Sequence, residues 1–125
     1  MAQTITAPQW GQFLTGPTQK QTYADQTGTA ASFTPGNKFT FVIARIAQKT
    51  FTAGTGTALP RYVVQASDDA FVTIFRIGSL ALERFSNAHG MVFCAALTAV
   101  KTAVRIVVTL DGTDTVTYDA DVVCI

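Results

Sequence analysis

Apolar and polar residues alternate in two segments near the C-terminal end of the chain. Every second residue is apolar from Val104 to Leu110, and the alternation returns from Val116 to Val122. A period of two is typical of β-strands with one buried face. A two-residue turn at Asp111-Gly112 would set apolar residues of one strand opposite polar residues of the other. A loop with an odd number of residues, 111–113 or 111–115, avoids this mismatch, so the pattern predicts a wide hairpin.

Several further strands are expected upstream. Residues 38–47 are apolar on both faces, which is typical of a central or covered strand. The pattern predicts a short hairpin, with strands at 61–67 and 71–78 and a turn at 68–70, and then one helical turn at 79–84. Residues 90–97 are predicted to form a strand, with a short helix as the alternative. The fold class expected is all-β, an antiparallel β-sandwich or jelly roll of about six to eight strands. Its predicted core comprises Phe39, Phe41, Ile43, Val64, Phe71, Ile74, Val104, Ile106, Val108 and Val122.

The first part of the chain differs in composition and in hydrophobic pattern. Residues 1–36 are rich in Thr, Gln, Gly and Pro and show no sustained period, so they are interpreted as an extended N-terminal arm ahead of a sandwich domain at 37–125. Large aromatic side chains in such an arm stabilise it only where they find a groove. The arm is therefore predicted to carry an assembly interface, formed by Trp10, Phe13, Leu14 and Tyr23.

Charge is sparse over the whole chain. Charged residues make up 14% of the sequence and the formal net charge is +1, whereas soluble domains usually contain about 25% charged residues. Such a surface protects weakly against association, so a homo-oligomer is expected. The lysines are dispersed, which disfavours a nucleic-acid partner. The N-terminus lacks the pattern of a secretory signal, and no apolar run is long enough for a membrane helix.

Residues that could carry chemistry are few. His89 is the single histidine and lies in a turn-like sequence, and no serine has the context of a nucleophile, so neither catalysis nor a cofactor is expected. Asp68 with Asp69, and Asp111 with Asp114, are interpreted as turn residues, with calcium ligation as the alternative. Cys94 and Cys124 are interpreted as buried thiols, with a disulfide as the alternative.

A carbohydrate-binding module is another hypothesis. Trp10, Tyr23, Tyr62 and Tyr118 are the aromatic side chains from which a sugar-stacking platform would be built. Most of the chain's aromatic residues, however, fall in strand registers, which favours packing in the core over exposure.

The segments "RYVVQASDDAFVTIFRIGSLAL" and "TAVRIVVTLDGTDTVTYDADVVC", which span residues 61–124, resemble the small all-β structural proteins of tailed-phage virions. The resemblance implies a non-enzymatic capsid-stabilising (decoration, or cement) protein, with a tail or neck component as the alternative. It also implies the major capsid protein of the same virion as a partner, and a location in the virion after synthesis in the host cytoplasm. An extended arm that reaches a neighbouring subunit suits such a role.

Overall fold

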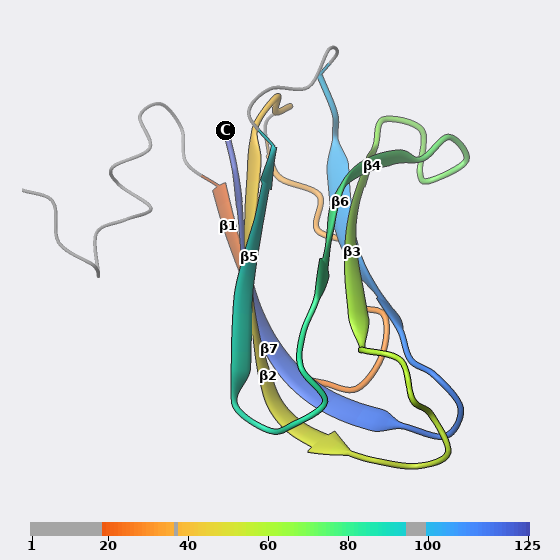
Figure 1. Cartoon of the computed structure of the whole chain (residues 1–125). Helices are drawn as coiled ribbons and strands as arrows, with labels where there is room; N and C mark the ends of the chain where they lie inside the picture. Colours follow the sequence, from red (N-terminus) through yellow and green to blue (C-terminus); the bar gives the residue numbers. More distant parts are fainter. Residues whose placement is uncertain (1–18, 37, 95–99) are drawn as a thin grey trace, which may run out of the picture.

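The computed structural model describes residues 19–36, 38–94 and 100–125, which form seven strands in two antiparallel sheets (Figure 1). One sheet has the order β1-β7-β2-β5 and the other the order β4-β3-β6. The described residues contain no helix, and the predicted all-β sandwich is confirmed. The strands are β1 (Gln19–Gln26), β2 (Val42–Thr52), β3 (Arg61–Ser67), β4 (Phe75–Ala81), β5 (Ala88–Cys94), β6 (Ala103–Thr109) and β7 (Thr115–Cys124).

The core lies between the two sheets and follows the alternation of the strands. In β7 the side chains of Val116, Tyr118, Ala120 and Val122 are buried, while those between them are half-buried or exposed. In β6, Val104 and Ile106 are fully buried. The period of two therefore identifies correctly which side of β6 and of β7 faces the interior.

The predicted hairpin between residues 103 and 122 is wrong. β6 pairs with β3 in the smaller sheet, whereas β7 pairs with β1 and β2 in the larger one. The connection at 110–114 therefore crosses from one sheet to the other. Apolar residues of the two strands meet face to face across the core instead of side by side within a sheet, and alternation alone does not distinguish these arrangements.

The second hairpin is present but has a longer loop than predicted. β3 and β4 pair as antiparallel neighbours, with β4 beginning only at Phe75. Phe71 and Ile74 consequently lie in the loop, and Ile74 is 46% exposed rather than in the core. The helical turn expected at 79–84 does not form, because β4 continues to Ala81.

The two apolar faces of β2 differ in burial. Val42, Ala44 and Ile46 are fully buried, whereas Phe41 and Ile43 are only half-buried on the outer face. Phe39 is buried as predicted, although it shares the parity of Phe41. The reason is a break in the strand, where the amides of both Thr40 and Phe41 donate to the carbonyl of Ile125.

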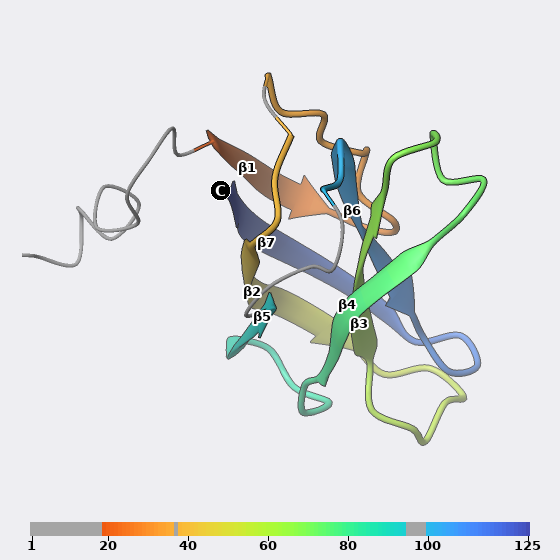
Figure 2. The same ribbon diagram turned by 90° about the horizontal axis from the view of Figure 1, so that it is seen from above.

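Part of the predicted arm belongs to the body of the sandwich. β1 pairs with β7 from Gln19↔Cys124 to Gln26↔Tyr118. The chain then passes to the smaller sheet, where the Ala30 amide donates to the Ile106 carbonyl at 3.1 Å and Phe33 forms a bridge with Val104. Figure 2 shows this segment running from β1 toward β6. Residues 19–36 thus complete one side of the sandwich.

Candidate assembly surfaces

The four residues predicted for the arm interface fall into two groups. Trp10, Phe13 and Leu14 lie outside the described residues, and their role stays a prediction. Tyr23 lies in β1, is 7% exposed, and donates a hydrogen bond of 2.5 Å to the carbonyl of Ala31. Burial raises the pKa of its phenol. Tyr23 is therefore held in the core of its own chain.

The other tyrosines are also core residues. Tyr62 and Tyr118 are fully buried and pack edge to face, with ring centroids 5.2 Å apart. Their hydroxyls donate to Gln48 Oε1 and to the Gly28 carbonyl, respectively. These three tyrosines cannot form an exposed platform for a sugar, so the carbohydrate-binding hypothesis loses most of its candidate residues.

The two cysteines are not placed for a disulfide. Cys94 in β5 and Cys124 in β7 both pair with Val42, from opposite sides of β2. Their Cα atoms are separated by two strand spacings, about 9.6 Å, and a disulfide requires less than about 7 Å. Cys124 is buried as a free thiol, and burial raises its pKa to about 12.

Asp111 and Asp114 bind the loop that joins β2 to β3. Asp111 accepts hydrogen bonds from the amides of Thr57 and Ala58, and Asp114 from those of Gly54 and Gly56. Arg84 donates to Asp114 at 3.0 Å and to the Gly56 carbonyl at 2.7 Å. We call the three residues Asp111, Asp114 and Arg84, which hold this loop, the loop clamp. These hydrogen bonds hold the pKa values of both carboxyl groups below the usual range. The largest contribution comes from the Thr57 amide for Asp111 and from the Gly54 amide for Asp114.

The loop clamp therefore gives the two aspartates a structural role. Among residues 19–36, 38–94 and 100–125, no group of three or more His, Cys, Asp or Glu side chains is gathered in a way that would hold a metal ion.

The outer face of the larger sheet carries charges of both signs in close pairs. Asp121 lies 2.7 Å from Arg45 and 3.7 Å from Lys20, and Lys49 lies 2.5 Å from Asp25. The Arg45–Asp121 pair borders a shallow hollow of about 420 Å³, which is also lined by Asp119 and His89. Since the charges are mutually neutralised, this hollow offers little net attraction to an ion.

The four sheet edges differ in how they are protected. β1 carries Lys20 and a bulge, and β4 carries Arg76 and faces a bulge in its pairing with β3. The edge of β6 is covered by the segment that contains Ala30 and Phe33, whose amides donate to the carbonyls of Ile106 and Val104. Charges, bulges and covering segments are the usual protection against edge pairing. β5 has neither a charged residue nor a bulge: its sequence "AHGMVFC" contains no Lys, Arg or Pro, and its seven pairs with β2 run without a break.

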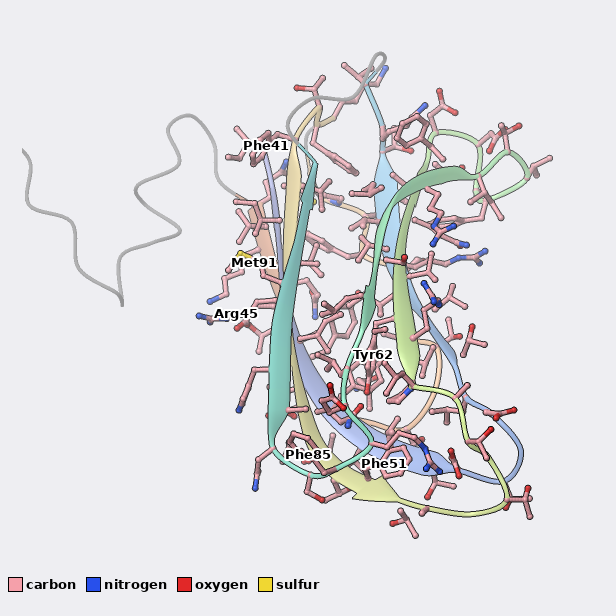
Figure 3. The ribbon with its side chains drawn as sticks, in the orientation of Figure 1. Phe41, Arg45, Phe51, Tyr62, Phe85 and Met91 are labelled. Carbon is pink, nitrogen blue, oxygen red and sulfur yellow. The ribbon has the colours of Figure 1, made fainter. Side chains whose placement is uncertain are left out.

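β5 also presents an apolar side chain to solvent. Met91 is 48% exposed on the outer face of the larger sheet, opposite Arg45. Figure 3 shows Met91, Arg45 and Phe41 pointing away from the smaller sheet, while Tyr62 lies between the sheets. Within the described residues β5 forms backbone pairs only with β2, so no strand is paired with its second edge. β4 packs beside β5, and the Leu80 side chain lies against Gly90. β5 is recognised as an edge strand from the order of strands in the sheet, where β2 is its one neighbour among the described residues, and not from its sequence.

Comparison with known proteins gives no indication of function, so the function is inferred from these surfaces. No protein-family model, no curated protein and no solved structure matches the chain. The described part of the chain contains no helix with the length and apolar character needed to cross a membrane.

Proposed function

We propose that this chain is a non-enzymatic structural protein of a phage virion, a capsid-stabilising decoration protein that self-associates and docks on neighbouring subunits. The observation that carries the proposal is the edge of β5 that no described strand pairs with; it is regular, contains no Lys, Arg, Asp or Glu, and exposes Met91. The low charge of the chain and the resemblance of residues 61–124 to tailed-phage structural proteins support the same function. A tail or neck component would use the same edge.

The polar groups of the chain also favour a structural role over an enzymatic one. Asp111 and Asp114 are bound to backbone amides, and the hydroxyls of Tyr62 and Tyr118 are directed into the core. Groups whose hydrogen bonds are already satisfied by the fold are poorly placed to bind and turn over a substrate.

Edge pairing of two copies would follow a simple geometry. Met91 is the middle residue of Ala88–Cys94. When two β5 strands pair antiparallel about a two-fold axis, Met91 of one copy lies opposite Met91 of the other, and the two larger sheets join into one. Side chains directly opposite in an antiparallel pair interact, and like charges there oppose pairing.

This geometry is tested by a charge exchange at Met91. Met91→Lys and Met91→Glu each place two like charges opposite one another, so each variant alone should sediment as a smaller species than the unmodified protein. An equimolar mixture of the two variants should recover the larger species, because Lys then lies opposite Glu. Val72→Lys is the matched control, since Val72 is 85% exposed but lies in the β3–β4 loop. A monomeric unmodified protein, or variants that associate as well as it does, would contradict the proposal.

Docking on capsids is tested separately through the N-terminal residues. Because residues 19–26 form β1, the deletion should cover only residues 2–18. It should leave the thermal unfolding of the sandwich unchanged and weaken binding to capsids measured by co-sedimentation. Unchanged capsid binding would remove Trp10, Phe13 and Leu14 from the interface.

A further inference from the structure

The outer face of the smaller sheet carries three arginines, none of which forms a salt bridge with a carboxylate of the described residues. The strands β3, β4 and β6 each contain one arginine, Arg61, Arg76 and Arg105, and none contains Asp or Glu. In the larger sheet, by contrast, Lys20, Arg45 and Lys49 are paired with aspartates. The two faces of the sandwich therefore differ in charge although the whole chain is nearly neutral.

The register brings two of these arginines into one row. Gln65 of β3 pairs with Arg76 on one side and with Arg105 on the other. The row Arg76–Gln65–Arg105 thus crosses the sheet with its two arginine Cα atoms about 9.6 Å apart. Val63 and Val107, both half-buried, pair next to this row on the same outer face, and Arg61 lies beyond them. Val63 and Val107 thus form an apolar centre, with Arg76 and Arg105 on one side of it and Arg61 on the other.

Arg105 is held in place by two neighbours. Its Nε donates to Gln65 Oε1 at 2.9 Å, and its guanidinium carbon lies 4.3 Å from the centre of the Phe71 ring. The bond to Gln65 uses only Nε, and no hydrogen bond joins the two terminal nitrogens to an acceptor of the described residues. A planar guanidinium fixed in this way is suited to a bidentate bond with a carboxylate.

The position of Phe71 has a conformational cost. Ala70 and Phe71 have φ angles of 58° and 64°, in the left-handed region that side chains larger than glycine rarely adopt. The Ser67 hydroxyl accepts from the Phe71 amide, and Asp69 accepts from the Thr73 amide, which holds the loop in this form. Such strain occurs preferentially at binding sites. Here it places an aromatic ring over Arg105.

We propose that the outer face of β4-β3-β6, centred on Arg76, Gln65 and Arg105, is a docking surface for an acidic protein segment that also carries apolar side chains. Carboxylates of the segment bind the arginines, and its apolar residues cover Val63 and Val107. A protein segment suits the surface better than a nucleic acid, because the apolar centre offers nothing to a phosphate backbone. This surface is distinct from the β5 edge, so the inference does not depend on self-association.

The test uses the full chain, labelled with ¹⁵N, and a soluble peptide with two glutamates separated by one residue and flanked by leucines. The control peptide has glutamine at both positions. We expect the acidic peptide to shift the Arg105 Nε–H signal and the amides of β3 and β6, and the glutamine peptide to bind at least tenfold more weakly. Raising the salt concentration should weaken binding of the acidic peptide.

Variants distinguish binding at this docking surface from nonspecific attraction between the peptide and any positive charge of the protein. Arg76→Ala and Arg105→Ala should each reduce affinity at least fivefold, and Arg105→Lys should not restore it, because lysine lacks the planar fork. Arg45→Gln, which removes a cation from the opposite face, and Met91→Lys, which changes the β5 edge, should leave peptide affinity unchanged. The variant spectra report directly whether each protein is folded.

Three results would overturn the inference. They are the absence of peptide-induced shifts on β3 and β6, equal binding of the acidic and glutamine peptides, and tighter binding of a single-stranded oligonucleotide than of the acidic peptide. None of them bears on the sedimentation of Met91 variants.

Discussion

The phenol of Tyr62 donates a hydrogen bond of 2.8 Å to Gln48 Oε1, and this bond joins the two sheets inside the core. Gln48 lies in β2 and is fully buried, and its amide nitrogen donates to the carbonyls of Glu83 and Phe85. Every polar atom of the Gln48 side chain is thus satisfied, as burial requires. The three hydrogen bonds of the Gln48 side chain thus join β2 to β3 and to the connection between β4 and β5.

Tyr62→Phe should therefore destabilise the protein by about 1–3 kcal/mol, because it leaves the buried Oε1 of Gln48 without a donor. Chemical denaturation monitored by fluorescence measures this change. Gln48→Leu should cost more than Tyr62→Phe, because it also removes the donor to the carbonyls of Glu83 and Phe85. A Tyr62→Phe variant as stable as the unmodified protein would show that the bond does not contribute.

The loop clamp predicts a steric effect at Gly56. A Cβ atom at this position would lie 2.3 Å from the Asp111 carbonyl oxygen and 2.4 Å from Asp114 Oδ2. Gly56→Ala should cost about 1–3 kcal/mol of stability, since two loops must separate to admit the methyl group. Gly28→Ala is the matched control, because nothing lies within 4 Å of its added Cβ. Equal melting temperatures for the two variants would contradict this account of the loop clamp.

The carboxylates also predict how stability depends on pH. Hydrogen bonds from backbone amides hold the pKa values of Asp69, Asp111 and Asp114 below the usual range. A carboxyl group with a lower pKa in the folded state contributes stability above its unfolded pKa of about 3.9, and loses it as the pH falls through the folded value. The melting temperature should therefore decline below about pH 4.

Asp114→Asn should lower the melting temperature at pH 7 and make the acid decline shallower, so that the two curves approach each other at low pH. Curves that stay parallel down to pH 2 would show that Asp114 contributes nothing through its charge.

Two isoleucines compare the core with the surface. Ile106 in β6 is fully buried and Ile74 in the β3–β4 loop is 46% exposed. Ile106→Ala should cost about 2–5 kcal/mol, and Ile74→Ala less than about 0.5 kcal/mol. Equilibrium unfolding in urea compares them directly. Similar losses at both positions would mean that the assigned faces are incorrect.

The same residues show how far the sequence predicts the fold. Alternation identifies Ile106 as inward-facing because a strand with one buried face has a period of two. It does not reveal that β6 and β7 belong to different sheets, since both arrangements bury the same residues. The pattern places Ile74 wrongly in a strand, because hydrogen bonds of the Ser67 and Asp69 side chains extend the loop beyond the predicted turn and leave no period in the sequence.

The candidate surfaces were less visible in the sequence than the core. Tyr23 is the single large apolar residue of β1, so its alternation could not be recognised, and only pairing with β7 makes it a core residue. The arginines of β3, β4 and β6 lie in three separate segments, and the sheet order alone brings them to one face. Likewise, an edge strand such as β5 is defined by which neighbours it lacks.

Hydrogen exchange in β5 tests the central claim, self-association through the edge that no described strand pairs with, most directly. Backbone amides that point away from β2 exchange rapidly in a single copy and become protected when a second strand pairs with them. As the protein concentration rises, peptides covering residues 86–94 should gain protection while those covering β3 stay unchanged. Association without any gain of protection in residues 86–94 would contradict the account.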